Sequence, residues 1–228
     1  MKAILLAGGY GTRLRPITNF VPKCLVPIKG VPLLDIWLEN LTKAGIGPFL
    51  INTHYLHNKV NDYIKSSDYK DSITIAYEKN LLGTAGTIIN NLDFVQGDDV
   101  MIIHADNYFN TDFKKLINNH NNRASNCIMS LIAFRSENPK SCGIITKNKK
   151  NILTDFDEKP KSPKSNLANG AIYFLSKECV DFITKNQFKD FSSQVIPNLI
   201  NKIFVIETKD TLIDIGNIET YLNAQLIK

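Results

Sequence analysis

The stretch that decides the fold stands at the start of the chain. It reads Met1-Lys2-Ala3-Ile4-Leu5-Leu6-Ala7-Gly8-Gly9-Tyr10-Gly11-Thr12-Arg13-Leu14-Arg15-Pro16, and Pro22-Lys23 follows shortly after it. The apolar run predicts a buried strand, and the glycines after it let backbone N–H groups approach an anion because no Cβ stands in the way. Arg13 and Lys23 add cationic donors that suit phosphate oxygens. The arrangement predicts a loop that binds a triphosphate.

Two other phosphate-binding loops can be excluded at this point. The dinucleotide fingerprint requires a third glycine where Leu14 stands, and a P-loop requires Gly-Lys-Ser/Thr where the chain has Gly11-Thr12-Arg13. An ordinary turn would explain Gly8 and Gly9 alone. It would not explain the basic residues that follow them.

The bulk composition indicates a globular protein that handles small anions. Of the 228 residues, 43% are apolar and 21% are charged, and 27 Lys and Arg stand against 22 Asp and Glu. This excess of positive charge is spread along the chain, so it suits anionic small substrates and does not indicate nucleic acid. No run has transmembrane length and the start has no signal-peptide layout, which predicts a cytoplasmic protein with no membrane partner.

The cysteines and histidines give only weak indications of metal or thiol chemistry. The four cysteines (Cys24, Cys127, Cys142 and Cys179) form no Cys-x-x-Cys pair, which argues against a zinc site or a disulfide framework. Cys24 could be a reactive thiol beside Lys23, but packing is the favoured interpretation. His54 and His57 could share a helical face as ligands, yet neither has an acidic or cysteine partner nearby in the sequence.

Strand and helix patterns alternate along the chain, which indicates an α/β protein of the Rossmann-like, three-layer α/β/α kind with a mostly parallel mixed sheet. After the first strand, the pattern predicts helices over 32–44, 59–66 and 84–92 and strands over 49–52, 73–77 and 100–104. Beyond residue 126 it predicts strands over 127–134, 143–146, 152–156, 168–175 and 203–208 and helices over 177–184, 192–199 and 217–226. We expect a single domain, 1–228, with halves of about 1–125 and about 126–228.

Two further sites can be placed on these elements. Asp106 follows the predicted strand 100–104, at the carboxyl end where open α/β sheets bind ligands. The segment Glu78-Lys79-Asn80-Leu81-Leu82-Gly83-Thr84-Ala85-Gly86 leads into a predicted helix, where glycines permit close approach and Thr84 can bond a polar ring. A helix cap at Thr84 explains the same segment without a ligand.

The residues quoted above resemble the signature of the sugar-1-phosphate nucleotidyltransferases, and Gly8 to Pro16 is most similar to the mannose-1-phosphate guanylyltransferases among them. Further motifs extend the resemblance over nearly the whole chain: Glu78 to Gly86, Glu158-Lys159-Pro160, Asn169-Gly170-Ala171-Ile172-Tyr173 and Leu212-Ile213-Asp214-Ile215-Gly216. The chain departs from the family at Leu212, where tryptophan is common, at Ala105, where glycine is frequent, and at Cys142, where tyrosine is usual.

The resemblance implies a fold of the nucleotide-diphospho-sugar transferase type, with a nucleotide-binding first half and a sugar-phosphate-binding second half. It implies catalytic roles for Arg13, Lys23 and Asp106, and Mg²⁺ held by Asp106 and Asp214. The nucleotide-binding residues it implies are Leu6, Ala7, Gly8, Gly9, Gly11, Thr12, Glu78, Gly83 and Thr84. The sugar-phosphate-binding residues it implies are Asn107, Gly143, Glu158, Lys159 and Asn169.

The reaction implied joins a nucleoside triphosphate to a sugar 1-phosphate, releasing pyrophosphate, for polysaccharide biosynthesis. Leu82-Gly83-Thr84-Ala85-Gly86 favours GTP and a GDP-mannose or GDP-heptose type of product, while CTP, UTP and dTTP stay open. The alternatives are a cytidylyl- or uridylyltransferase for another sugar phosphate or for a small head group such as phosphocholine, and, more distantly, a non-catalytic nucleotide-binding module. Small members of the family often pair, so a homodimer is open.

Overall fold

The computed structural model describes residues 1–95 and 97–227. The chain forms two compact units, and each is assembled from separated stretches of sequence. The first unit comprises Met1–Leu81, Ile103–Phe113 and Thr211–Lys228, and the second comprises Leu82–Ile102 and Lys114–Asp210. The chain leaves the first unit after residue 81 and returns to it twice. The functional division into about 1–125 and about 126–228 stays a prediction.

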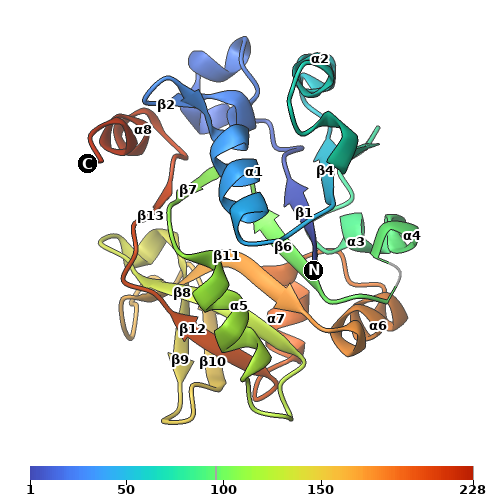
Figure 1. The fold of residues 1–228 in the computed structure, drawn as a ribbon. Helices are drawn as coiled ribbons and strands as arrows, with labels where there is room; N and C mark the ends of the chain where they lie inside the picture. The colour runs from blue at the N-terminus through green and yellow to red at the C-terminus, as the bar shows by residue number, and fades with distance from the viewer. Residues whose placement is uncertain (96, 228) are drawn as a thin grey trace. The chain divides into compact units, whose positions relative to one another are not determined.

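The first unit contains three parallel strands in the order β1-β4-β5. Figure 1 labels β1 and β4, the first two of them. Their bounds are Lys2–Leu6 for β1, Phe49–Thr53 for β4 and Ile73–Tyr77 for β5. Every residue of β4 is buried, as expected for a strand with neighbours on both edges and cover on both faces. Parallel strands end at the same edge, so the residues that follow β1 and β4 meet there.

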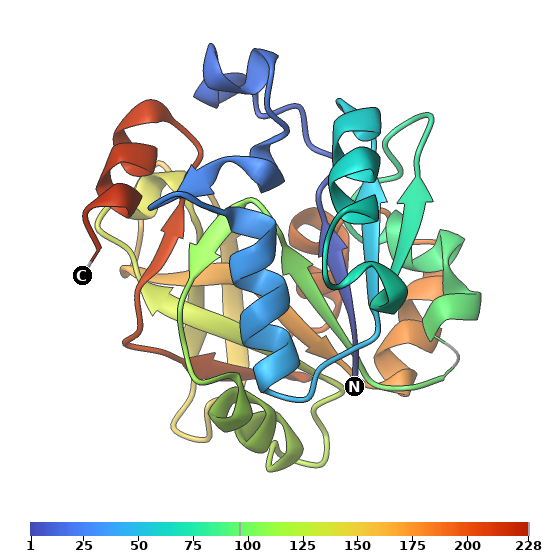
Figure 2. The same ribbon diagram turned by 45° about the horizontal axis from the view of Figure 1, so that its top comes forward.

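Two helices pack on these strands (Figure 2). Helix α1 (Leu33–Lys43) buries a stripe at helical spacing that consists of Leu33, Leu34, Trp37, Leu38 and Leu41. The chain turns away after α1 at Gly45, whose φ of +78° suits glycine. Helix α2 (His57–Lys65) lies along β5 and buries Val60 and Ile64.

Shorter elements complete the first unit. Strands β2 (Pro27–Ile28) and β3 (Val31–Pro32) form a hairpin, and β7 (Asn107–Phe109) pairs antiparallel with β13 (Leu212–Asp214). Helix α8 (Ile218–Gln225) begins with a capping box between Asn217 and Thr220. It is held to the hairpin by Tyr221 and Gln225, which both donate hydrogen bonds to the carbonyl oxygen of Pro27.

A buried tryptophan fixes the segment that carries the central aspartate. The Trp37 ring is 1% exposed, and its Nε1–H donates to the carbonyl oxygen of Asn107 at 2.8 Å. Its centroid lies 6.4 Å from that of Phe109 and 5.9 Å from that of Phe113. Because Asn107 follows Asp106 directly, α1 determines where the Asp106 backbone lies.

The second unit contains the mixed part of the sheet. Its strands are β8 (Met129–Arg135), β9 (Gly143–Lys147), β10 (Leu153–Glu158), β11 (Leu167–Leu175) and β12 (Ile203–Glu207). The pairs β10/β9, β9/β11 and β11/β8 are antiparallel, whereas β8 and β12 are parallel. Strand β6 (Val100–His104) begins in this unit and ends in the first. The α/β class with a mixed sheet, predicted from the alternating patterns, is confirmed.

The helices of the second unit show where the sequence patterns were less accurate. They are α3 (Gly86–Asn90), α4 (Leu92–Val95), α5 (Phe113–Asn121), α6 (Lys177–Asn186), a π-helical turn (Phe191–Val195) and α7 (Ile196–Asn198). The predicted helix over 84–92 starts late, because the N–H groups of Ala85 and Gly86 donate to the Lys189 carbonyl. The predicted helix over 192–199 begins as a π-helical turn, and only 196–198 is α-helical. Pro197 has no N–H to donate to the preceding turn.

Among the described residues, no helix has both the length and the apolar character needed to cross a membrane.

A neutral histidine is buried in the second unit. His120 of α5 is fully buried, its Nδ1 lies 2.7 Å from Ser130 Oγ, and its ring stacks on Phe174. Burial first, and then the charge of Arg123, lower the pKa of His120 to about 4, although Asp99 partly opposes both effects. The folded protein therefore keeps this ring uncharged at neutral pH.

Acid should destabilise the protein through this histidine. Between pH 6.5 and 4 the unfolded chain binds a proton at His120 that the folded chain does not, so the free energy of unfolding falls as pH drops through this window. Urea unfolding at several pH values should show this slope, and His120→Gln should make it shallower. An equally steep slope in that variant would contradict the assignment.

Candidate active site

The glycine loop packs tightly on one side and is open on the other. A Cβ at Gly8 would lie 3.2 Å from Asn52 Nδ2, whereas one at Gly9 would meet nothing within 4 Å. Gly11 has a φ of +60°, and a Cβ there would lie 2.9 Å from Thr18 Cγ2. The loop is further held by Thr18, whose hydroxyl donates to the Gly11 carbonyl at 2.7 Å. A side chain would therefore be crowded at Gly8, and both crowded and strained at Gly11, while Gly9 leaves the backbone accessible.

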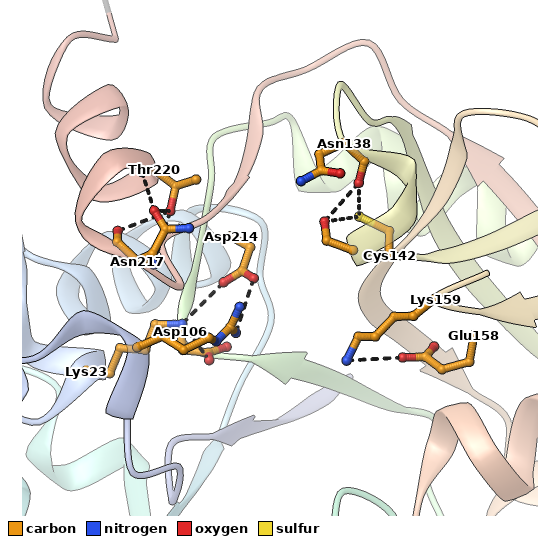
Figure 3. A network of polar contacts seen from close by, with 11 residues as sticks. Lys23, Asp106, Asn138, Cys142, Glu158, Lys159, Asp214, Asn217 and Thr220 are labelled. Carbon is orange, nitrogen blue, oxygen red and sulfur yellow. Dashed lines mark hydrogen bonds and ion pairs between the residues drawn. The ribbon is translucent and has the colours of Figure 1, made fainter. Parts of the chain in front are cut away.

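Two carboxylates from distant parts of the chain meet on one lysine (Figure 3). The Lys23 ammonium lies 2.8 Å from Asp106 Oδ2 and 3.3 Å from Asp214 Oδ1. The Lys23 side chain is 7% exposed, while those of Asp106 and Asp214 are 39% and 53% exposed. A Cβ at Gly11 would lie 3.4 Å from Lys23 Cβ, so this cluster adjoins the glycine loop. The structure therefore brings together the loop, the lysine and both predicted acids.

Arg13 is an exposed side chain that contacts Asp214, one of the two acids. Its Nη2 lies 3.7 Å from Asp214 Oδ2, and its side chain is 69% exposed. Arg13 belongs to a short 3₁₀ turn (Thr12–Leu14) that follows Gly11, and Leu14 anchors this turn by being fully buried. The guanidinium is therefore available to an incoming anion.

The charges in this cluster shift the acidity of its members. Burial by itself would raise the pKa of Asp106, but the charges of Lys23 and His104 and the hydrogen bond from Lys23 outweigh it and hold the pKa below its ordinary value. Burial raises the pKa of the Cys24 thiol to about 12. Cys24 is 1% exposed, so it packs and is not a reactive thiol.

The residues fit a magnesium ion. Mg²⁺ binds hard oxygen donors, usually one or two carboxylates completed by substrate phosphates and water. Asp106 and Asp214 supply two such carboxylates, and their joint contact with Lys23 shows that they can surround a cation. Among the described residues, no group of three or more His, Cys, Asp and Glu side chains could hold a metal.

Asn52 and His54, two residues that the sequence analysis did not assign to the loop, connect it to Glu78. Asn52 Oδ1 accepts from Ala7 N–H at 2.7 Å, and Asn52 Nδ2 donates to Glu78 Oε1 at 3.0 Å. His54 Nε2 lies 2.9 Å from the Tyr10 hydroxyl. The sequence indicated this role only weakly. Both polar residues come at the end of a buried strand, and residues two positions apart in a strand lie on the same face. Glu78 itself is 3% exposed.

Gly83 and Thr84 make a second close approach, within the second unit. Gly83 has a φ of +86°, and a Cβ there would lie 2.3 Å from the Lys189 carbonyl oxygen. The Thr84 hydroxyl donates to Asp190 Oδ2 at 3.1 Å and accepts from Phe191 N–H at 2.9 Å. The alternative explanation of Thr84 as a helix cap is therefore wrong, since its hydroxyl bonds a different segment and α3 begins two residues later. Its role in nucleotide binding stays a prediction.

The residues predicted to bind the sugar phosphate are spread over both units. Asn107 is 8% exposed in the first, and the other four lie in the second. Lys159 Nζ lies 3.6 Å from Glu158 Oε1 (Figure 3), and a Cβ at Gly143 would lie 2.8 Å from Glu158 Oε2. The Asn169 side-chain amide makes hydrogen bonds within β11. Its Nδ2 donates to the Tyr173 hydroxyl, and its Oδ1 accepts from Ala171 N–H. A sugar-phosphate role for these residues stays a prediction.

The comparisons with known proteins agree with this geometry. Residues 2–227 match the model of the nucleotidyl transferase family. A D-glycero-alpha-D-manno-heptose 1-phosphate guanylyltransferase of Campylobacter jejuni is 31% identical over 97% of this chain and 97% of its own. A glucose-1-phosphate adenylyltransferase of Bacillus subtilis is 30% identical over 98% of this chain and 66% of its own.

A solved structure shows the same fold. The crystal structure of HddC from Yersinia pseudotuberculosis complexed with GMP-PN superposes with a TM-score of 0.81 at 24% identity, covering 98% of this chain and 97% of that one. The chain belongs to the nucleotidyl transferase family, and within it to the sugar-1-phosphate nucleotidyltransferases. It spans 59–66% of the length of several curated relatives.

Gly216 provides a test of the position of Arg13. A Cβ at Gly216 would lie 2.9 Å from Arg13 Nη2, and the guanidinium, as the end of a flexible side chain, would move away from Asp214. Gly216→Ala should leave the melting temperature nearly unchanged and lower kcat/KM by about ten- to a hundredfold, the usual cost of misplacing a positioning group. Wild-type turnover in this variant would show that the Arg13 position is unimportant.

Proposed function

We propose that the protein transfers a nucleotidyl group from a nucleoside triphosphate to a sugar 1-phosphate, releasing pyrophosphate and forming a nucleotide sugar. The observation that carries the proposal is the meeting of Asp106 and Asp214 on Lys23 beside the glycine loop. Family membership supports the same reaction class.

The chemistry needs little from the protein besides alignment and charge. A phosphate oxygen of the sugar 1-phosphate attacks the α-phosphorus in line, a new P–O bond forms, and the bond to the β-phosphate breaks with its electrons leaving on pyrophosphate. The nucleophile is already anionic, so no general base or covalent intermediate is required. Arg13 and Lys23 stabilise the negative charge of the transition state.

Asp106 and Asp214 would hold Mg²⁺, which when bound neutralises phosphate charge and helps to orient the triphosphate. The two carboxylates also serve the protein directly. They hold the Lys23 ammonium in place, so that it is positioned before the substrate arrives.

The remaining substrate contacts are proposed from the motifs. Leu6, Ala7, Gly8, Gly9, Gly11 and Thr12 would hold the triphosphate, and Glu78, Gly83 and Thr84 the nucleobase. Lys159 would contact the sugar phosphate, with Glu158 accepting from hydroxyls or holding Lys159, as their 3.6 Å separation allows. Gly143, Asn169 and Asn107 complete the proposed sugar site, and a homodimer and a cytoplasmic location also remain proposals.

GTP is the nucleotide we propose, in a GDP-mannose or GDP-heptose type of reaction. The segment Leu82 to Gly86 supports this base, because its Leu-Gly-Thr-Ala-Gly sequence resembles the guanylyl-type members of the family. The similarity to the Campylobacter jejuni heptose 1-phosphate guanylyltransferase supports the same base. The similarity to the Bacillus subtilis adenylyltransferase adds ATP to the alternatives. CTP or UTP with another sugar phosphate or a head group such as phosphocholine is the second candidate.

A thermal-shift panel with Mg²⁺ and GTP, ATP, CTP, UTP or dTTP tests the proposed base. A ligand that binds only the folded protein raises its melting temperature by mass action, so GTP should give the largest rise. A larger rise with another triphosphate would replace GTP with that nucleotide. No rise with any of the five would contradict nucleotide binding itself.

Loss of a catalytic charge should abolish most turnover. Arg13→Ala and Asp106→Ala should each lower kcat by about 10²–10³, or about 3–4 kcal/mol, because each removes one preorganised charge contact. Pyrophosphate release from GTP and a sugar 1-phosphate measures this. Lys149→Ala, which removes a charge from the exposed turn between β9 and β10, is the matched control and should stay within about twofold of wild type. Near wild-type rates in Arg13→Ala or Asp106→Ala would remove that residue from the mechanism.

A further inference from the structure

The end of β4 holds the glycine loop at two points. Asn52 accepts from the Ala7 backbone at the start of the loop, and His54, two residues on, contacts the Tyr10 hydroxyl near its end. A Cβ at Gly8, between these points, would lie 3.4 Å from His54 Cβ. The loop therefore lies directly against these two side chains.

Both side chains also bond Glu78. Asn52 Nδ2 donates to the Glu78 carboxylate at 3.0 Å, and His54 Nδ1 lies 2.8 Å from the Glu78 carbonyl oxygen. Glu78 follows β5 and opens the segment through Gly86 that we assign to the nucleobase. Two hydrogen-bonded paths thus run from the phosphate loop to the proposed base segment, one through Asn52 and one through His54.

The contacts of His54 fix its tautomer. A carbonyl oxygen only accepts, so His54 Nδ1 must carry the hydrogen that bonds Glu78. In the neutral ring Nε2 is then an acceptor, and the Tyr10 hydroxyl donates to it at 2.9 Å. The rings meet edge to face with centroids 5.2 Å apart. These contacts orient the Tyr10 side chain, although Tyr10 is 47% exposed.

We propose that His54 is a positioning residue that sets the phosphate loop, through Tyr10, relative to Glu78, the residue at which the nucleobase segment begins. It touches no reacting atom. A ligand that contacts both the loop and the base segment benefits from the correct spacing between them, while a ligand that contacts only the loop does not. This inference rests on the proposed function, because it assumes that the loop binds phosphates and that Glu78 opens the base segment.

Two variants break the same hydrogen bond from opposite ends. Tyr10→Phe keeps the ring and removes the hydroxyl. His54→Asn keeps a side-chain amide near the position of Nδ1, within reach of the Glu78 carbonyl, and removes the acceptor for Tyr10. Tyr55→Phe is the matched control: it removes a hydroxyl from a neighbouring ring, whose centroid lies 5.7 Å from that of Tyr10, and leaves the contact between Tyr10 and His54 intact.

The affinities of GTP and of inorganic tripolyphosphate, measured by calorimetry, separate the possible roles. In Tyr10→Phe and His54→Asn, GTP should bind about tenfold more weakly, the effect of one lost hydrogen bond. Tripolyphosphate should stay within about twofold of wild type, and so should both ligands in Tyr55→Phe. The double variant Tyr10→Phe/His54→Asn should bind GTP no more weakly than either single variant, because both substitutions remove the same hydrogen bond.

Three results would overturn the inference. Unchanged GTP affinity in both single variants would show that the contact positions nothing. Equal losses for GTP and tripolyphosphate would show that the contact only maintains the loop. A ¹⁵N spectrum in which neutral His54 carries its proton on Nε2 would exclude the bond to Glu78. If the wild-type protein binds no nucleoside triphosphate, the proposed function fails first, and this inference fails with it.

Discussion

The contact on which this site depends is the one between the Lys23 ammonium and the carboxylates of Asp106 and Asp214. A cation that is 7% exposed is stable only if opposite charges replace its lost hydration. Two carboxylates that converge without a cation would repel each other. Asp106 lies 83 residues after Lys23 in the sequence, and Asp214 lies 191 residues after it. The three charges therefore come into contact only when the first unit folds.

The apolar frame around the cluster explains how it stays in place. Trp37 holds the backbone after Asp106, and Leu212 pairs with Phe109 to set the strand that ends at Asp214. Leu212 is 9% exposed, so it fills a buried position where the family commonly has tryptophan. Ala105 is fully buried, and its N–H donates to the Leu6 carbonyl. Neither departure disturbs the carboxylates, because backbone pairing and burial carry their positions.

The polar end of β4 shows how a buried strand can hold a surface loop in position. Thr53 and its neighbours are buried for packing, while the polar side chains that alternate with them bond the loop backbone and the Tyr10 hydroxyl. In the second unit, Gly83 and Gly143 play a different part, since each permits a segment to approach more closely than a Cβ would allow. Crowding, and not conformational freedom alone, explains why glycine occupies these positions.

Much of this protein could be predicted from residues that act locally. The apolar run of β1, the stripe of α1 and the glycines of the loop are properties of neighbouring residues, and their elements lie within a few positions of the expected ones. The sequence missed β7, β13 and α5, which are short or weakly patterned and are stabilised by pairing or packing with distant segments. It misplaced the starts of α3 and α7 for related reasons. The roles of Asn52, His54 and Thr84 were decided by tertiary structure alone, because a hydrogen bond to a residue 20 or more positions away leaves no periodic trace in the chain.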